Sequence, residues 1–407
     1  MSPRDRSLTR WHLLLAVLIA HGSLYPFDFA LPEFPGQAIR QMFTSIHLWT
    51  SRGDVLGNFL LFLPWGLASA LTRAPEKNHL SAALGLALAG ILQILQIGLP
   101  SRDAALSDIV WNAAGIYTGQ FVLAPAAQRI LAARTGYFKG GALPLVLAAL
   151  WLAAQTAPCI PSLDFALLRA NIRAFFAPEP WSLAAFIITF SGVLALGHIA
   201  LTLLPARTIA LTALTMLLPA VLCARLFIVQ SAPHWHDAAA MLSGYAGMLA
   251  LGDPRRIAPA AFAAMLLGLT LAGLEPYTLS GHTGGFGWLP FAAYLRGNMQ
   301  DNLRELLEIS WHCTALLWLA HAMGARIQGV GIFIIIWVLS LEIIQIWLEG
   351  RSADVTPALT CALLVPLIVR LARSKAPPPS MPKRARIRRA PKDSDESIPS
   401  PDYSKST

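Results

Sequence analysis

Residues 329–348 read GVGIFIIIWVLSLEIIQIWL and contain one charged side chain, Glu342. The block has the length of roughly 20 residues that an α-helix needs to cross the hydrocarbon core of a bilayer. Apolar blocks of this kind recur along the chain and are separated by short polar connectors, which is the pattern of consecutive membrane-spanning helices. The sequence therefore predicts an all-α, polytopic membrane protein with one continuous membrane domain.

The composition supports this class. The 407 residues are 55% hydrophobic and 13% charged, whereas soluble domains carry about 25% charged residues. The net charge is +9, but Lys and Arg are concentrated near the termini and between apolar blocks, without the basic stripe typical of nucleic-acid binding. Cysteines are widely spaced, at Cys159, Cys223, Cys313 and Cys361. We expect no nucleic-acid partner, no disulfide framework, no metal site and no cofactor.

The apolar blocks predict about twelve transmembrane helices. They lie near residues 11–24, 55–72, 80–99, 104–125, 142–160, 181–205, 208–230, 236–252, 257–274, 303–323, 329–348 and 354–373. The first block is short and follows three arginines, so a cleaved signal peptide is the alternative interpretation there. An even number of spans places both termini on one side, and the positive-inside rule makes that side the cytoplasm.

Similar segments follow the first, fifth and ninth apolar blocks. Each contains a proline, and a glutamine follows it 69 or 70 residues later; the pairs are Pro26 and Gln96, Pro161 and Gln230, and Pro276 and Gln345. Six residues beyond each glutamine stands Arg102, His236 or Arg351, respectively. This period predicts three related four-helix units, all inserted the same way up, over residues 1–126, 141–252 and 257–373.

Residues 374–407 are rich in Pro, Ser and charge and have little to bury. We therefore predict a disordered basic tail. Its basic cluster within 383–389 either attaches to anionic lipid headgroups or serves only as a topology signal that keeps the terminus inside.

The first unit carries a distinctive polar pattern. Asp54-Val-Leu-Gly-Asn58 is followed by Pro64 and Gly66, and the turn before the fourth helix contributes Arg102, Asp108, Asn112 and Gly115. With the motif Tyr25-Pro26-Phe27, this pattern resembles the VanZ-like family, best over residues 11–120 and more weakly over 257–373. The resemblance implies a multi-pass protein of the bacterial cytoplasmic (inner) membrane that is linked to glycopeptide-type antibiotic tolerance.

Two departures from the family pattern concern the first unit. Gln93 and Ala105 stand where the family has Glu and Asp. The third unit has Glu342 and Asp354 at these positions, but Pro357 and Cys361 replace the equivalents of Asp108 and Asn112. The middle unit keeps little beyond its turn, where His234, His236 and Asp237 suggest either a weak metal or proton site or, more simply, a solvated loop.

Charged side chains cost about 2.5–3.5 kcal/mol in a bilayer core on insertion scales, so we expect the polar residues to face the interior of each bundle. The candidate headgroup pocket comprises Asp54, Asn58, Arg102, Asp108 and Asn112. Secondary candidates are Asp28, Glu342, Gln345, Arg351 and Asp354. The guanidinium of Arg102 could form two parallel hydrogen bonds to a phosphate or a carboxylate. The alternative is that Arg102 pairs with Asp108 or Asp54 only to fix the helices.

These residues suggest a non-enzymatic membrane protein that binds or modulates an anionic cell-envelope lipid or lipid-linked precursor. A second hypothesis is a membrane enzyme that transfers or hydrolyses a lipid headgroup, with Asp54 or Asp108 as general base and Arg102 as anion clamp. The sequence has no HExxH, GxSxG or Walker motif, so we assign no catalytic residues. A third is a scaffold whose tail recruits partners.

Overall fold

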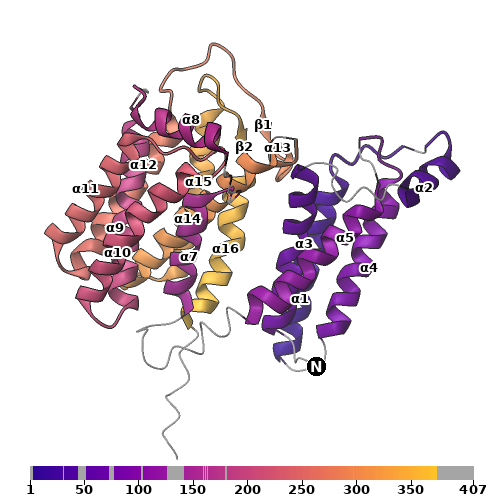
Figure 1. The fold of residues 1–407 in the computed structure, drawn as a ribbon, viewed down its shortest axis with the longest axis horizontal. Helices are drawn as coiled ribbons and strands as arrows, with labels where there is room; N and C mark the ends of the chain where they lie inside the picture. The colour runs from indigo at the N-terminus through magenta and orange to yellow at the C-terminus, as the bar shows by residue number, and fades with distance from the viewer. Residues whose placement is uncertain are drawn as a thin grey trace, which may run out of the picture. The chain divides into compact units, whose positions relative to one another are not determined.

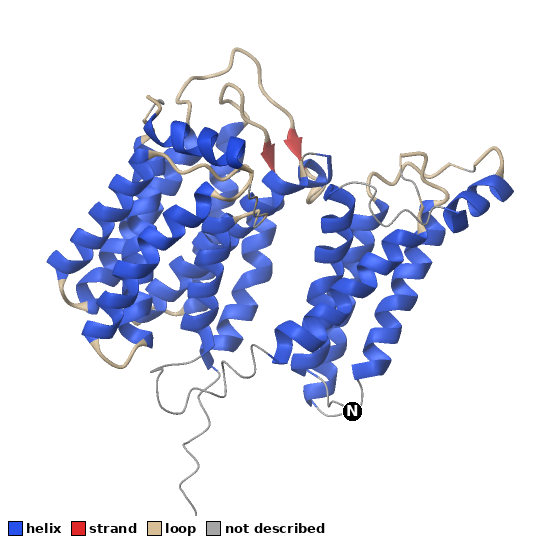
Figure 2. Ribbon diagram, in the orientation of Figure 1, coloured by secondary structure: helices blue, strands red, loops and turns tan. Residues whose placement is uncertain are grey.

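The computed structural model describes residues 3–30, 32–44, 52–72, 78–101, 104–125, 142–158, 160, 162, 164–178, 181–296 and 298–373. Within these ranges the fold is all-α, apart from one pair of two-residue strands (Figures 1 and 2). β1 (Phe286–Gly287) pairs in parallel with β2 (Ala353–Asp354). Arg102, Cys159, Pro161 and the predicted tail lie outside the described residues.

The N-terminal helices share one apolar core. They are α1 (Pro3–Leu24), α2 (Pro35–Thr44), α3 (Arg52–Thr72), α4 (Asn78–Gln96) and α5 (Leu106–Tyr117), which continues into the π-helical segment η2 (Thr118–Leu123). The core centres on Ile19, Phe62, Trp65 and Ile116. α3 packs closely along α5, because Gly66 and Gly115 leave no side chain between the two backbones.

The later helices pack around a second core. They are α7 (Ala142–Thr156), α8 (Phe165–Phe176), α9 (Leu183–Leu203), α10 (Arg207–Leu226), α11 (Trp235–Leu251), α12 (Pro254–Leu274), α13 (Ala292–Arg296), α14 (Met299–Ala322), α15 (Ile327–Gln345) and α16 (Thr356–Arg373). α9 is the most enclosed helix, and α11 and α12 pack along it. Trp151 and Trp311 are the largest fully buried side chains of this core.

Each of the twelve predicted apolar blocks contains a helix. Among the described residues, five helices are long and apolar enough to cross a membrane: α4, α9, α10, α12 and α15. α3, α7 and α16 contain shorter apolar stretches, and α14 carries Arg304, Glu305 and Glu308 in its first turns. The sequence therefore predicted where the helices lie, whereas fewer than twelve meet the length and hydropathy of a span.

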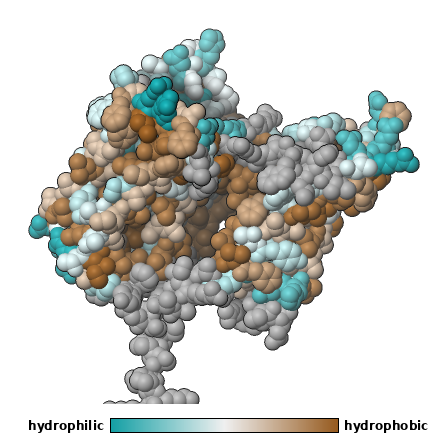
Figure 3. Space-filling model, in the orientation of Figure 1, coloured by the Kyte–Doolittle hydropathy of each residue, from teal (hydrophilic) through white to brown (hydrophobic). Residues whose placement is uncertain are grey.

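The helix surfaces are unusually apolar. Ile332 and Ile336 on α15 are 60% and 59% exposed, and Ile94 on α4 is 61% exposed. Figure 3 shows hydrophobic residues over the flanks of the helices in this view, while hydrophilic residues gather near their ends. Large exposed apolar areas of this kind need a nonaqueous partner, which is compatible with a bilayer around the helices.

Three helices were not predicted. α2, α8 and α13 follow the first helix of each predicted unit and are only 10, 12 and 5 residues long. Phe43 on α2 and Phe176 on α8 are 56% and 74% exposed, whereas Met42 and Asn171 on the same helices are buried. Short helices with one apolar exposed side are typical of the interface plane of a membrane.

The segments after α1, α7 and α12 make similar backbone contacts. Ala30 N–H donates to Gly98 O (2.8 Å), Val229 N–H to Ile160 O (3.1 Å), and Ser280 N–H to Trp347 O (2.8 Å). In each case the chain after one helix hydrogen-bonds to the turn two long helices later. Phe27 and Tyr277, each directly after a proline, also share φ 66°, which is uncommon for aromatic residues.

Candidate functional site

The predicted first-unit pocket is described only in part. Arg102, its predicted anion clamp, lies outside the described residues, so its role stays a prediction. Asp54 is exposed in the first turn of α3, and Asn58, one turn later, is half-buried. Asn112 on α5 is buried, and its Oδ1 has no hydrogen-bond partner among the described residues. Asp28 is exposed and accepts a hydrogen bond from Ser101 Oγ (2.8 Å).

Gln93, a departure from the family pattern, organises this end of the first unit. Its Oε1 accepts from the backbone N–H of Ala105 (3.0 Å), and its Nε2 donates to Asp108 Oδ2 (3.2 Å). In the third unit, Glu342 Oε2 accepts from the backbone N–H of Asp354 (3.1 Å). The same backbone position is therefore held by an amide in one unit and by a carboxylate in the other.

The predicted middle unit contains a buried ion pair that the sequence did not reveal. Arg225 on α10 is 6% exposed and lies 3.2 Å from Asp237 Oδ2. Its guanidinium also donates to the carbonyls of Ser231 (3.2 Å) and Ala232 (3.4 Å). Asp237 Oδ2 further accepts from the N–H of His234, which caps α11 (3.1 Å). This network fixes the turn and engages the aspartate proposed for a metal or proton site.

A polar cavity of about 250 Å³ lies within the predicted third unit. Its walls come from α13 and α14 through Tyr294, Asn302 and Glu305, and from α15 through Glu342 and Gln345. The turn into α16 supplies the rest of the wall, including Gly350, Arg351, Ser352, Asp354 and Pro357. Four secondary candidates from the sequence therefore meet here, namely Glu342, Gln345, Arg351 and Asp354.

Backbone hydrogen bonds hold two of the cavity carboxylates. Besides the bond to Glu342 Oε2, the N–H of Thr356 donates to Asp354 Oδ1 (2.6 Å) at the start of α16. The second oxygen of each carboxylate, Glu342 Oε1 and Asp354 Oδ2, accepts no hydrogen bond from the described residues. Both groups are thus fixed in place with one acceptor atom each available to a ligand.

Tyr294 contributes a neutral hydroxyl. Asn302 Nδ2 donates to the carbonyl of Tyr294 and anchors α13 on α14. Burial raises the pKa of the Tyr294 hydroxyl well above its ordinary value, and the nearby Glu305 carboxylate adds to the rise. The hydroxyl is enclosed without a hydrogen bond of good geometry among the described residues, and it remains protonated at any physiological pH.

Arg351 does not pair with a carboxylate of the cavity. Its Nε donates to the carbonyl of Glu275 (2.7 Å), and its Nη2 donates to the carbonyl of Ala272. These carbonyls end α12, where the last C=O groups lack helical partners. Arg351 therefore caps α12 with part of its guanidinium, while the side chain stays exposed beside the cavity.

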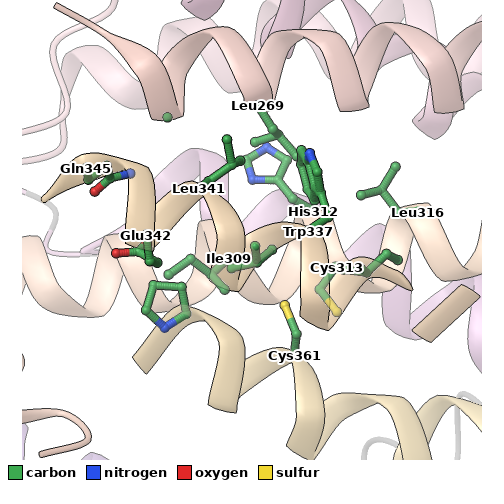
Figure 4. Close-up of a pocket in the computed structure, with 14 residues that line it drawn as sticks. Leu269, Ile309, His312, Cys313, Leu316, Trp337, Leu341, Glu342, Gln345 and Cys361 are labelled. Carbon is green, nitrogen blue, oxygen red and sulfur yellow. The ribbon is translucent and has the colours of Figure 1, made fainter. Parts of the chain in front are cut away.

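An apolar groove adjoins the cavity, and Figure 4 shows its lining. It has a volume of about 150 Å³ and lies between α12, α14, α15 and α16. Its walls include Leu269, Ile309, Leu316, Val338 and Leu341, together with the thiols of Cys313 and Cys361. Glu342, Gln345 and Pro357 line both the groove and the cavity. The two spaces therefore adjoin at the end of α15.

Two polar side chains in this region lack partners. Gln345 is 8% exposed, and its side-chain amide makes no hydrogen bond with the described residues. The imidazole of His312 lines the groove and likewise makes none among the described residues. The Gln345 amide and the His312 imidazole line these spaces, so both can form hydrogen bonds with a ligand.

Sequence reasoning missed Asn302, Glu305 and Tyr294. Glu305 lies inside the predicted span 303–323, whereas Tyr294 and Asn302 lie in the connector before it. The usable signal was periodicity, because Asn302, Glu305, Ile309 and His312 recur at helical spacing and line one side of α14. This side of α14 therefore contributes residues to both the cavity and the groove.

Among the described residues, no group of three or more His, Cys, Asp or Glu side chains is arranged to hold a metal ion. No family model, curated protein or solved structure matches the chain. The resemblance to the VanZ-like family therefore rests on the residues of this sequence.

Proposed function

We propose that the chain is a multi-pass membrane protein that binds an amphiphilic lipid molecule in its third unit. The headgroup lies in the polar cavity, and an acyl chain lies in the apolar groove. The observation that carries this proposal is the shared lining of the two spaces by Glu342, Gln345 and Pro357. A site that is polar at one end and apolar along the helices matches the two halves of a lipid.

The size of the site supports a ligand rather than bound water alone. The cavity and groove measure about 250 and 150 Å³, and together they reach the lower part of the range of about 300–1,000 Å³ for ligand pockets. The position supports a lipid, because α12 and α15, which border the groove, are both long and apolar enough to cross a membrane.

The architecture in this proposal is twelve transmembrane helices in three related units, with both termini in the cytoplasm. The corresponding backbone hydrogen bonds after α1 and α12 support related units, as do the matching contacts of Gln93 and Glu342. With the N-terminus in the cytoplasm, every odd-numbered span ends at the outer surface. In this proposal α2, α8, α13 and the cavity follow odd-numbered spans and therefore lie near that surface.

The resemblance to the VanZ-like family adds a physiological role. In a bacterial cytoplasmic membrane, a protein that binds or modulates an envelope lipid or a lipid-linked precursor would alter the response to glycopeptide-type antibiotics. We propose binding rather than headgroup chemistry, because the polar cavity continues into an apolar groove that would hold the acyl chain of a bound lipid. The first-unit residues Asp54, Asn58, Arg102, Asp108 and Asn112 remain the second candidate headgroup site.

The proposal is tested by filling the groove. Cys361 is 2% exposed and lines the groove, so Cys361→Phe occupies the space of an acyl chain. Cys223→Phe makes the same change on the exposed surface of α10. The measurement is the number and identity of lipids retained by purified, folded protein in native mass spectrometry.

We expect wild type and Cys223→Phe to retain one tightly bound lipid and Cys361→Phe to lose it. Equal retention by all three folded proteins contradicts groove binding. If the retained molecule is instead a covalently altered lipid that accumulates with time, the protein is an enzyme and the binding proposal is wrong. Thermal unfolding of each variant in detergent establishes that it is folded.

A further inference from the structure

We infer that the cavity selects a zwitterionic aminophospholipid head, with a protonated primary amine among the carboxylates and a phosphate beside Arg351. The inference rests on the proposed lipid binding and specifies its ligand. It follows from the charges of the cavity, from the atoms that remain available for hydrogen bonding, and from the position of the groove.

The charge balance of the cavity favours a cation at its centre. Glu305, Glu342 and Asp354 supply three carboxylates, and Arg351 is the one guanidinium among the described lining residues. Part of that guanidinium is engaged with the backbone at the end of α12. An ammonium group stabilises the ionised form of these carboxyl groups, whereas an anionic head without an amine disfavours it.

Available acceptor atoms suit a primary amine. Glu342 Oε1 and Asp354 Oδ2 accept nothing from the described residues, and the buried Gln345 amide has no partner there. An ammonium group has three donors that can point to acceptors in different directions. Hydrogen bonds from a charged donor are about twice as strong as those between neutral groups.

In this inference, Arg351 binds the phosphate of the lipid head. A guanidinium has five N–H donors, and two of its nitrogens donate to the carbonyls of Glu275 and Ala272. The carbonyls fix the orientation of the side chain, and its remaining donors stay available beside the cavity. A phosphate bound there lies next to the ammonium subsite, as the two groups lie in an aminophospholipid head.

The number of N–H donors distinguishes this ligand from other cationic heads. A primary amine has three when protonated, and each methyl group on the nitrogen removes one. A trimethylammonium head keeps its charge and has none. If fixed carboxylates recognise the donors, affinity falls along the methylation series, whereas recognition of charge alone leaves affinity unchanged.

The experiment titrates the full-length purified protein with phosphatidylethanolamine, its N-methyl and N,N-dimethyl forms, phosphatidylcholine and phosphatidylglycerol, all with identical acyl chains. Native mass spectrometry measures binding. The variants are Glu342→Gln and Asp354→Asn, which keep an oxygen for the backbone bonds. Gln93 shows that an amide at the equivalent position accepts such a bond. Glu308→Gln is the control, since Glu308 pairs with Arg304 (2.9 Å) outside the cavity.

We expect wild type and Glu308→Gln to prefer the primary amine over phosphatidylcholine by at least about tenfold, with the methylated forms between them and phosphatidylglycerol weaker than phosphatidylethanolamine. Glu342→Gln and Asp354→Asn should each lower that preference by about tenfold. Equal binding of all heads, tighter binding of phosphatidylglycerol, or an unchanged ranking in both variants would overturn the inference.

Failure of this inference is distinguishable from failure of lipid binding. If the lipids bind without headgroup preference and Cys361→Phe abolishes binding, the groove site stands and the amine assignment is wrong. If Cys361→Phe leaves all binding unchanged, the groove site itself is wrong, and the amine assignment falls with it.

Discussion

Gln93 and Glu342 make the same kind of backbone contact but have different polar neighbours. Both accept a hydrogen bond from the backbone of the turn that follows their helix. Gln93 also donates to Asp108, which an ionised glutamate at this position could not do. The predicted third unit has Pro357 at the position equivalent to Asp108, so Glu342 has no aspartate at that position. Gln93 therefore binds both the backbone of the turn and a neighbouring aspartate, whereas Glu342 binds the backbone of its turn.

The two hydrogen bonds of Gln93 predict the effect of the substitution Gln93→Glu. The new carboxylate keeps the bond from Ala105 but loses the donor to Asp108 and faces its charge, so we expect a loss of about 1–3 kcal/mol in the free energy of unfolding. Adding Asp108→Asn restores a donor and should recover most of the loss. Thermal unfolding of the purified variants measures both changes, and a double variant no more stable than Gln93→Glu would show that the two side chains are not coupled.

At the scale of elements, the glycines of the VanZ-like pattern have a packing role. A Cβ at Gly66 would overlap the backbone carbonyl of Ile116, and one at Gly115 would overlap that of Phe59. Small residues allow helix backbones to approach closely in membranes. These two positions therefore fix the distance between α3 and α5, which carry Asp54 and Asn58 on one side and Asp108 and Asn112 on the other.

Gly115→Ala is accordingly expected to destabilise the protein by about 1–3 kcal/mol, because one added methyl group must separate two packed helices. Gly90→Ala on α4 is the matched control, since a Cβ there has no atom within 4 Å. In that helix interior, alanine is favoured over glycine by about 1 kcal/mol. Equal unfolding temperatures for the two variants would contradict the packing role.

The helices were largely predictable from the sequence, because long apolar blocks leave few alternatives in which the backbone is satisfied. α2, α8 and α13 were missed because they are only 10, 12 and 5 residues long and lie in connectors between the long apolar blocks. The period of the repeat led to Glu342, Gln345, Arg351 and Asp354. It could not reveal Glu305 or Tyr294, because their place in the cavity depends on how α13 and α14 pack.

At the scale of the whole molecule, the outward and inward apolar sides of α15 would contact lipid in different ways. The outward side of α15 carries exposed residues such as Ile332 and Ile336, which any bilayer lipid can contact transiently. The inward side carries Val338 and Leu341 in the groove. A protein that only resides in the membrane uses the first surface, whereas a protein that binds a lipid specifically uses the second as well.

The most direct test of lipid binding in the groove is photo-crosslinking with a phosphatidylethanolamine that carries a diazirine on its acyl chain. Labelled peptides are mapped by mass spectrometry with and without excess unlabelled lipid. We predict adducts on groove residues such as Ile309, Val338 and Cys361 that the competitor abolishes, beside adducts on Ile332 and Ile336 that it only dilutes. Adducts confined to the outward residues of α15, with none in the groove, would contradict the proposed function.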